Sequence, residues 1–472
     1  MPSVDATVDY LDQQDEKLIY LAREIWAHPE VALQERFACN LLADELEAAG
    51  FRVERDIGQL STAFVASWGS GTPIIGILGE YDALPGLSQQ LSPERSPIEQ
   101  GGPGHGCGHN LFGVASLGAA LAIKAAMEAD QLPGTIRFYG CPAEETLVGK
   151  TFMAKAGVFD DLDAALAWHP GDVNMASCSS SLAMNSFKVN FYGVASHAAF
   201  DPHNGRSALD GAQLMDVGVN YLREHVIPEA RIHSVITSGG QAPNVVPAYA
   251  QIWYYVRAPQ RDQVDAIYQR MLDIAKGAAL MSGTTYDIDF VTGCYEVLPN
   301  LALAQLLYEK LQEAGAIEFA PEEVAFAKQI QQSFAPGMLK HALSMTQRVT
   351  AGELDPALLD QPLWGEILKH SETFTVMPGS TEVGDVSQIT PTAQITTACW
   401  PFGSPAHSWQ IVASSGSSVG MKGMLLAAKA IALAGIDLLT KPEVLAAAKA
   451  EFNQRQRGKQ YVTPIPEGII PH

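Results

Sequence analysis

The stretch PIIGILGEYDALP, residues 73–85, says most about the fold of this chain. Its first part, 73–78, is a continuous apolar run, which is typical of a central strand covered on both faces. Polar residues follow at once, Glu80 and Asp82 among them. Ligands collect beyond the C-terminal ends of the strands in parallel sheets, so we expect a functional site at this edge.

Strand and helix patterns alternate on both sides of this run. A helical pattern covers 8–50, and a helix of small residues is expected at 111–127 after a loop rich in proline, serine and glycine. Further strands are expected at 51–56, 62–68, 135–139, 164–168 and 393–399. This alternation predicts an α/β fold with a mostly parallel sheet that is covered on both faces.

The pattern changes near Ser179. Over 183–293 the order β-α-β-β-α-β predicts a small ferredoxin-like α+β domain inserted into the first domain. We therefore expect a catalytic domain from 1–182 and 294–472, with 183–293 as an inserted lid or dimerisation domain. Residues 321–374 contain no motif that we can interpret.

Composition excludes several classes of partner. The chain has 472 residues, 47% of them hydrophobic, and a net charge of −22. A length above that of most single domains predicts two domains. The negative charge repels phosphate backbones and anionic membrane surfaces, so we expect neither nucleic acid nor a membrane as partner.

Location is predicted from the N-terminus, one apolar stretch and the cysteines. The first residues lack the basic and apolar regions of a signal peptide. The apolar stretch 421–439 contains Lys422, Lys429 and Asp437, so we expect a packed helix and not a membrane span. Six cysteines without clustered spacing are typical of reduced thiols, and we expect a cytoplasmic protein.

Side chains able to bind metals concentrate in four short segments. Cys107 and His109 lie two residues apart and are both good ligands for zinc-like ions. Glu144 and Glu145 follow an expected strand. Adjacent buried carboxylates repel each other, so a nearby cation would explain them. One of the two can then bind metal while the other takes a proton from water.

His169 at a strand end and His407 in a loop after the last strand complete these segments. Each feature also has a simpler interpretation. Cys107 can be a small core residue, and paired glutamates at a helix start can simply favour the helix dipole. Cys107 could also be the nucleophile of a thiol hydrolase. That alternative leaves the paired glutamates and two histidines without a role, so the joint pattern favours a metal site.

Five segments, in this order along the chain, resemble the metal-dependent aminoacylase/carboxypeptidase family, and within it the amidohydrolase branch. They are GHGCGHN at 104–110, PAEE at 142–145, HP at 169–170, SHAA at 196–199 and HS at 407–408. The resemblance extends from about residue 15 to about residue 440. The chain departs from the branch at Asn110 and Glu80, where aspartate is usual.

The resemblance implies a zinc-peptidase-like fold and two divalent metal ions per chain, zinc or manganese, with cobalt as a further choice. The implied ligands are Cys107, His109, Glu145, His169 and His407, with Cys107 as the candidate bridge. Glu144 would be the general base and later the proton donor to the leaving amine. Asp82 matches the acidic residue that orients a ligand histidine.

The inserted domain matches the family at three further residues. His197 matches the histidine that polarises the scissile carbonyl, often across a dimer interface. Asn244 and Arg257 match residues that hold the substrate carboxylate, a role that suits a guanidinium. Without the resemblance, His197 would be interpreted as a surface residue and Arg257 as the partner of a nearby acid.

The resemblance implies hydrolysis of an amide bond next to a free carboxylate. The first expected substrate is p-aminobenzoyl-glutamate, and a dipeptide or another N-acyl amino acid is the alternative. A non-catalytic, metal-binding regulatory subunit is an alternative of another class. The expected assembly is a homodimer through the inserted domain, or a heteromer with a related A-type subunit.

Overall fold

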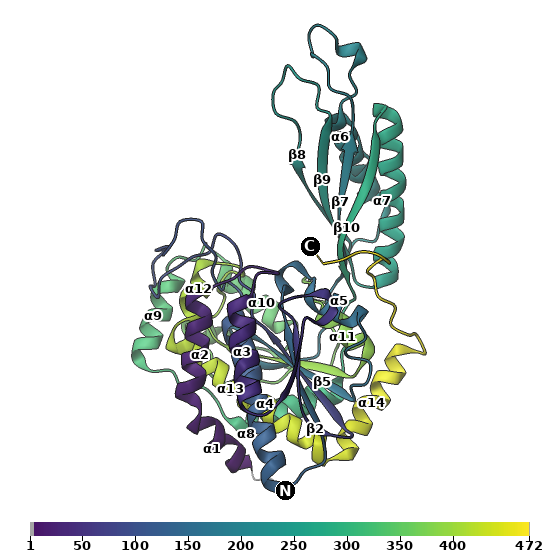
Figure 1. Cartoon of the computed structure of the whole chain (residues 1–472). Coiled ribbons are helices and arrows are strands. Elements are labelled where there is room, and N and C mark those ends of the chain that lie inside the picture. Colours follow the sequence, from purple (N-terminus) through teal and green to yellow (C-terminus); the bar gives the residue numbers. More distant parts are fainter. Residues whose placement is uncertain (1–3, 472) are drawn as a thin grey trace. The chain divides into compact units, whose positions relative to one another are not determined.

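The computed structural model describes residues 4–471, which form two compact units. Unit 1 takes its described residues from Met1–Ser179, Leu298–Thr375 and Val386–Tyr461. Unit 2 takes its described residues from Ser180–Val297, Val376–Asp385 and Val462–His472. Figure 1 labels the elements of both units.

Unit 1 is built on an eight-stranded sheet with the order β1-β2-β4-β3-β5-β12-β6-β11. The apolar run 73–78 becomes part of β3, which lies between β4 and β5 and is buried at every residue after the first. This strand is therefore covered on both faces, as predicted. The strands of the sheet are β1 (Arg52–Arg55), β2 (Phe64–Ser70), β3 (Ile74–Glu80), β4 (Gly134–Cys141), β5 (Ala164–Gly171), β6 (Asn174–Ser177), β11 (Ile367–Leu368) and β12 (Thr392–Ala398).

The sheet is mixed, so the prediction of a mostly parallel sheet describes its centre better than its edges. β4, β3, β5 and β12 pair in parallel. The pairs β1–β2, β2–β4 and β12–β6 are antiparallel. Parallel neighbours need a long crossover, usually a helix. Short links without an α-helix follow β1, β2 and β5, so the chain reverses direction at each of them.

The helical pattern at 8–50 folds as three helices. The pattern predicted neither of the two interruptions. The first lies at Gln14, and the second begins at His28 and Pro29, where proline disfavours helical backbone in the residue before it. The helices outside 183–293 are α1 (Val4–Gln13), α2 (Asp15–Ala27), α3 (Arg36–Ala48), α4 (His109–Asp130), α5 (Gly149–Lys155), α8 (Leu301–Ala314), α9 (Pro321–Gln331), α10 (Met338–Gln347), α11 (Val383–Ile389), α12 (Trp409–Ser415), α13 (Ser418–Thr440) and α14 (Pro442–Gln456).

The core of unit 1 is formed by the sheet and two long apolar helices, α4 and α13, which pack against each other. Both helices are long and apolar enough to cross a membrane. However, 83% of the apolar window of α4 and 78% of that of α13 are buried inside the protein. Such burial is typical of core helices, in agreement with the prediction of a packed helix at 421–439.

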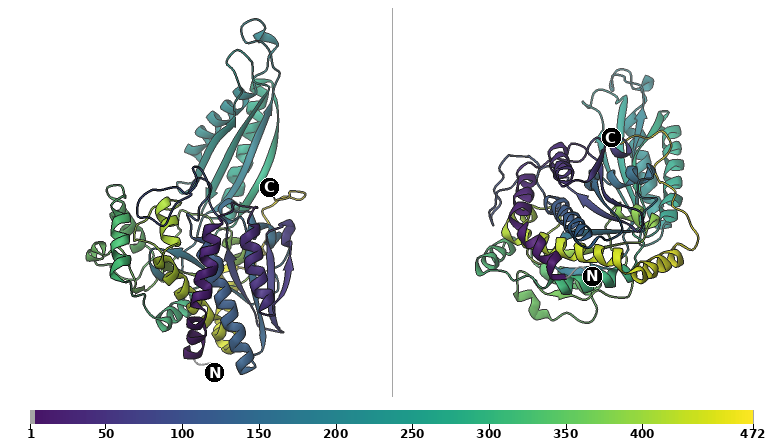
Figure 2. Two further views of the ribbon diagram at one scale, coloured as in Figure 1. Left: turned by 60° about the vertical axis from the view of Figure 1, so that its left-hand side comes forward. Right: turned by 60° about the horizontal axis from the view of Figure 1, so that its bottom comes forward.

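Unit 2 contains a four-stranded antiparallel sheet with the order β10-β7-β9-β8. Its elements are β7 (Ala183–Tyr192), α6 (Ala208–Leu222), β8 (Arg231–Ser238), β9 (Tyr249–Ala258), α7 (Arg261–Ser282) and β10 (Thr285–Cys294). Burial alternates along β9, and both α6 and α7 contact this strand. One face of the sheet is therefore covered by the two helices, while its other face is more open (Figure 2).

Candidate metal centre and active site

The predicted side chains of unit 1 gather at the C-terminal edge of its parallel strands. Glu80 ends β3, Glu144 follows β4, and His169 lies near the end of β5. α4 begins at His109, and His407 lies in the loop between β12 and α12. Because β3, β4, β5 and β12 are parallel, their C-terminal ends lie at the same edge of the sheet.

Asp82 connects two of these segments. One of its carboxylate oxygens, Oδ1, lies 2.9 Å from His109 Nδ1, and the other accepts a hydrogen bond of 2.9 Å from the backbone N–H of Glu145. Both Asp82 and His109 are buried. The hydrogen bond to Nδ1 fixes the imidazole so that its Nε2 faces the other acidic and histidine side chains.

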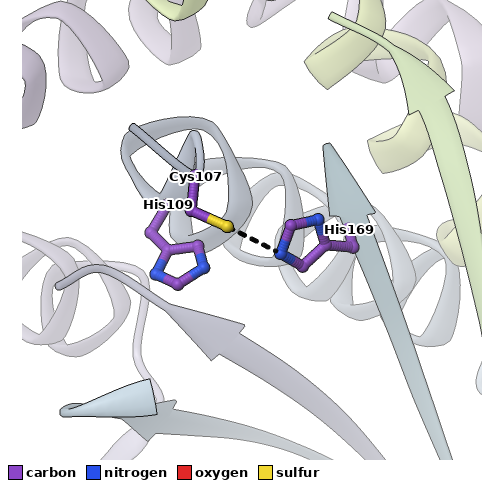
Figure 3. A group of neighbouring side chains, drawn as sticks. All are labelled: Cys107, His109 and His169. Carbon is purple, nitrogen blue, oxygen red and sulfur yellow. Dashed lines mark hydrogen bonds between the residues drawn. The ribbon is translucent and has the colours of Figure 1, made fainter. Parts of the chain in front are cut away.

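A first group able to bind a metal ion consists of Cys107, His109 and His169, whose ligand atoms all lie within 4.8 Å of one another (Figure 3). Cys107 Sγ lies 3.4 Å from His169 Nε2. His169 Nδ1 lies 2.7 Å from the carbonyl oxygen of Pro170, to which it donates a hydrogen bond when it carries the ring proton. In that tautomer the lone pair of Nε2 faces Cys107, as metal binding requires.

A second group consists of Cys107, Glu145 and His407, again with all ligand atoms within 4.8 Å of one another. His407 Nε2 lies 3.3 Å from Glu145 Oε2. Cys107 belongs to both groups, so the structure brings all five predicted ligand residues together around one thiol.

A third group consists of Glu80, His109 and Glu144. His109 Nε2 lies 3.3 Å from Glu80 Oε2 and 4.0 Å from Glu144 Oε2. The other Glu80 oxygen forms an ion pair of 2.7 Å with Lys150 Nζ, and both of these side chains are buried. Lys150 therefore brings a positive charge to the acidic side of the site.

The paired glutamates lie on a tight turn with unusual backbone geometry. Glu144–Thr146 is a short 3₁₀ helix between Ala143 and Leu147, which have φ values of 54° and 58°. Residues other than glycine rarely adopt such left-handed backbone, and they do so most often at functional sites. The backbone N–H of Ala143 donates a 2.8 Å hydrogen bond to the buried carboxylate of Glu35, which holds the turn in place.

The pKa values of the protein groups by themselves show how crowded the acids are. Burial and the charge of Glu80 raise the pKa of Glu144 to about 7. Burial also raises the pKa of Glu145 to about 8, and Glu144 adds to this shift. A divalent cation between these groups would favour their ionised forms and reverse the shifts.

Unpartnered polar atoms agree with a cation at this position. His109 Nε2, Glu80 Oε2 and Glu145 Oε1 are buried and have no hydrogen-bond partner among the described residues. Buried polar atoms normally have partners, and these three belong to the groups able to bind metal. Thiolate, imidazole and carboxylate together form a donor set that suits zinc-like ions.

The three predicted residues of unit 2 lie in two places. His197 and Asn244 belong to adjacent segments, joined by a β-bridge from His197 to Val245 and by a hydrogen bond from Ala198 N–H to the Asn244 carbonyl. The backbone N–H groups of Ala199 and Phe200 donate to His197 Nδ1, which leaves Nε2 to carry the ring proton. Arg257 lies on β9 and is half-buried, and its Nε has no hydrogen-bond partner among the described residues.

Sequence patterns did not assign Glu35, Glu80 or Lys150 to the site. Glu80 had a usable signal, because it ends the strand that leads to Asp82, where ligands collect in parallel sheets. Glu35 and Lys150 are brought to the site from other elements. Neither has a local sequence pattern that predicts this position.

Comparison with known proteins agrees with these motifs. The family described as Peptidase family M20/M25/M40 matches residues 76–342. The B-type chain of the p-aminobenzoyl-glutamate hydrolase of Escherichia coli (strain K12) is 42% identical over 469 residues, which cover 98% of this chain and 97% of that protein. The Xaa-Arg dipeptidase of Homo sapiens is 30% identical over 479 residues, covering 97% and 94%.

The fold is shared with solved structures. A Bacillus subtilis protein described as a dinuclear metal binding peptidase from the M20 family matches with a TM-score of 0.56 and 18% identity, over 91% of this chain and 99% of that one. At this identity the match shows the fold alone. The family match and the two relatives at 42% and 30% identity carry the assignment. The chain therefore belongs to Peptidase family M20/M25/M40, which confirms the resemblance of its motifs and the predicted class of enzyme, a hydrolase of amide or peptide bonds.

Proposed function

We propose that this protein hydrolyses an amide bond next to a free carboxylate, and that p-aminobenzoyl-glutamate is its first substrate. The products would be p-aminobenzoate and glutamate. The observation that carries this proposal is the 42% identity, over nearly the whole chain, with a hydrolase named for that substrate. The 30% identity with the dipeptidase is lower over a similar share of the chain.

Two divalent ions would be held by the two groups that share Cys107. Cys107, His109 and His169 would hold one ion, and Cys107, Glu145 and His407 the other. When bound, such ions polarise a carbonyl oxygen and make a water molecule easier to deprotonate. Zinc or manganese fits this donor set, with cobalt as a further choice. Asp82 would keep His109 in the tautomer that binds metal.

Glu144 would act as the general base. Its carboxylate takes a proton from the attacking water as the new C–O bond forms at the amide carbon. Glu144 then gives this proton to the leaving nitrogen as the C–N bond breaks. Glu144 is suited to this exchange because it is mostly buried and lies next to the proposed ligands His109 and Glu145.

Unit 2 would supply substrate contacts. His197 would donate its Nε2–H to the scissile carbonyl oxygen, a role that its Nδ1 hydrogen bonds support. Asn244 and Arg257 would hold the substrate carboxylate, and a guanidinium without an internal partner supports this role. The element order supports a ferredoxin-like lid or dimerisation domain.

The proposed assembly is a homodimer through this domain or a heteromer with a related A-type subunit. The 42% identical relative is named as one of the subunits of its hydrolase, which supports a heteromer. A cytoplasmic location remains our prediction, and it is supported by cysteines that form no disulfide among the described residues.

Dipeptide hydrolysis is the second candidate, favoured by the 30% identity with a dipeptidase. A thiol hydrolase is disfavoured, because it would leave the paired glutamates and two of the histidines beside Cys107 without a role. A non-catalytic metal-binding subunit would not need Glu144 beside the complete set of proposed ligands.

The test is hydrolysis of p-aminobenzoyl-glutamate by the purified chain, after chelation and after addition of manganese or zinc. We expect activity to disappear on chelation and to return with metal. Dipeptides and other N-acyl amino acids are assayed in parallel. Turnover of those compounds, but not of p-aminobenzoyl-glutamate, would favour a dipeptidase or N-acyl-amino-acid hydrolase. Metal binding without turnover of any compound would favour a regulatory subunit.

A further inference from the structure

The open face of the sheet in unit 2 has an unusual distribution of charge. Along β9 the residues Ala250, Ile252, Tyr254, Val256 and Ala258 are buried, and the residues between them belong to the opposite face. That opposite face includes Trp253, Tyr255 and Arg257, all half-buried. The helices α6 and α7 contact β9, and these three side chains lie on the face of the sheet opposite the buried residues.

Two arginines lie directly opposite each other on this face. Arg257 of β9 is the register partner of Arg231 of β8, and the next pair on the same face is Tyr255 with His233. Like charges directly opposite each other destabilise an antiparallel pair. Neither arginine forms an ion pair with an acid among residues 4–471, although the whole chain has a net charge of −22.

The pKa of His233 reflects the positive charge on this face. Burial lowers its pKa, and Arg257, Arg223 and Arg231 lower it further. Arg223 is engaged within the fold, since its Nε donates to Asn220 and its Nη1 to the Ile232 carbonyl. Arg257 and Arg231 are the two of these guanidinium groups that are register partners on the open face.

The hydrogen bonds of these two arginines leave donors free. The buried Nε of Arg257 has no partner among the described residues. Arg231 uses Nη1 to donate to the carbonyl oxygens of Pro228 and Ala230, at 2.7 and 2.8 Å, which anchors its guanidinium and leaves its other nitrogens for a ligand. An anchored guanidinium loses less conformational entropy when it binds a carboxylate.

A hollow adjoins these cations. It has a volume of about 220 Å³ and is lined by His233, Ser234, Val235, Trp253 and Tyr255. Tyr255 also lies beneath the Arg257 guanidinium, with 5.7 Å from Cζ to the ring centroid. The aromatic side of the hollow thus reaches Arg257, while its β8 side, formed by His233, Ser234 and Val235, is exposed.

We propose that Arg231 and His233 form a second carboxylate subsite beside Arg257, so that the enzyme prefers amides of a dicarboxylic amino acid such as glutamate. This inference rests on the proposed function, in which Arg257 holds the α-carboxylate. The side-chain carboxylate then lies against Arg231 and His233. Directly opposed residues have Cβ atoms about 4.5–5.5 Å apart, so the two arginine side chains start from neighbouring positions on one face of the sheet.

The test compares p-aminobenzoyl-glutamate with p-aminobenzoyl-glutamine, which replaces only the side-chain carboxylate by a neutral amide. We expect kcat/KM of the wild-type protein to favour the glutamate compound by about ten- to a hundredfold, the size of a charge-assisted hydrogen bond. In R231M this preference should fall toward one, because hydrolysis of the glutamate compound slows more than that of the glutamine compound.

Two further variants control for charge and folding. R270M removes the same charge from α7, where Arg270 donates to the His225 carbonyl, and should keep the wild-type preference. R231K keeps the charge at the subsite and should keep part of the preference. Equal hydrolysis of both compounds by the wild-type protein, or a full preference in R231M, would overturn the inference.

If neither compound is hydrolysed, the proposed function has failed and binding decides the inference separately. Calorimetry then compares N-benzoyl-glutamate with N-benzoyl-glutamine on the wild-type protein and R231M. Tighter binding of the glutamate compound that is lost in R231M supports the subsite. Equal binding of the two compounds rejects it.

Discussion

At the scale of single residues, the site depends on a few side chains that each serve two neighbours. Asp82 holds His109 through one oxygen and the backbone of Glu145 through the other. Cys107 lies within reach of both metal-binding groups. Glu144 and Glu145 are adjacent in sequence, yet only Glu145 belongs to a group with Cys107. This difference in surroundings is the physical basis for giving the two carboxylates different roles.

The first prediction separates those two roles. Glu144→Gln should lower kcat by about 10²- to 10⁴-fold, the usual contribution of a general acid–base, while the metal content stays near that of the wild type. Glu145→Gln should lose bound metal, because a carboxamide is a weaker ligand. Activity assays with elemental analysis of both variants measure the difference. Loss of metal from Glu144→Gln would instead make Glu144 a ligand.

At the scale of elements, the turn after β4 determines where the paired glutamates point. Left-handed backbone at Ala143 and Leu147 is unfavourable by itself, so surrounding contacts must stabilise it. The Glu35 carboxylate accepts hydrogen bonds from Ala143 N–H, Leu33 N–H and the Thr62 hydroxyl. A buried acid close to α3 thus connects the N-terminal segment to the turn that positions Glu144.

A second prediction follows for this anchor. Glu35→Ala leaves buried N–H groups without partners and should lower the free energy of unfolding by about 2–5 kcal/mol. Glu35→Gln can keep the accepted bonds through its carbonyl oxygen and should lower it much less. Chemical denaturation of the metal-free proteins measures both values. Equal stability of the two variants would show that these hydrogen bonds do not stabilise the turn.

The wild type and Glu35→Gln should also differ in how their free energies of unfolding depend on pH. Burial and the charge of Asp82 raise the pKa of Glu35 to about 7, so the folded protein holds this proton at a pH where the unfolded chain has released it. Stability contributed by the protonated form is complete below the unfolded pKa near 4.5 and is lost as pH rises through about 7. Between pH 4.5 and pH 7 the free energy of unfolding of the wild type should fall, relative to that of Glu35→Gln, by at most about 3 kcal/mol. A free energy of unfolding that increases with pH would contradict the raised pKa of Glu35.

At the scale of the whole molecule, close approach of helix and sheet sets the packing of unit 1. α13 crosses β12 at Gly423, where an added Cβ would lie 2.5 Å from Cys399 Sγ and 2.6 Å from the Ala398 carbonyl oxygen. β12 pairs with β5, the strand that carries His169, and leads into the loop of His407. Packing between α13 and β12 therefore supports the strands that carry the site.

A third prediction tests this contact. Gly423→Ala should destabilise unit 1 by about 1–3 kcal/mol through overpacking, although alanine favours helix more than glycine does. Gly277 in α7 is the control, because an added Cβ there meets nothing within 4 Å, and Gly277→Ala should stabilise by up to about 1 kcal/mol. Thermal and denaturant unfolding compare the two variants. If Gly423→Ala leaves the free energy of unfolding unchanged, α13 can move away from the sheet without lowering stability.

The sequence by itself determined the central covered strand, the alternation of strands and helices over 51–168, the family and the segments that gather at the site. Each of these depends on local periodicity or on an ordered set of short motifs, which a linear sequence contains in full. Only the tertiary structure decided that Cys107 lies within reach of two groups, that Glu35 and Lys150 enter the site, and that the sheet is mixed. It also decided that Arg231 faces Arg257. These features join residues far apart in the chain, and strand register and loop length, which set such contacts, depend on the packing of the whole fold.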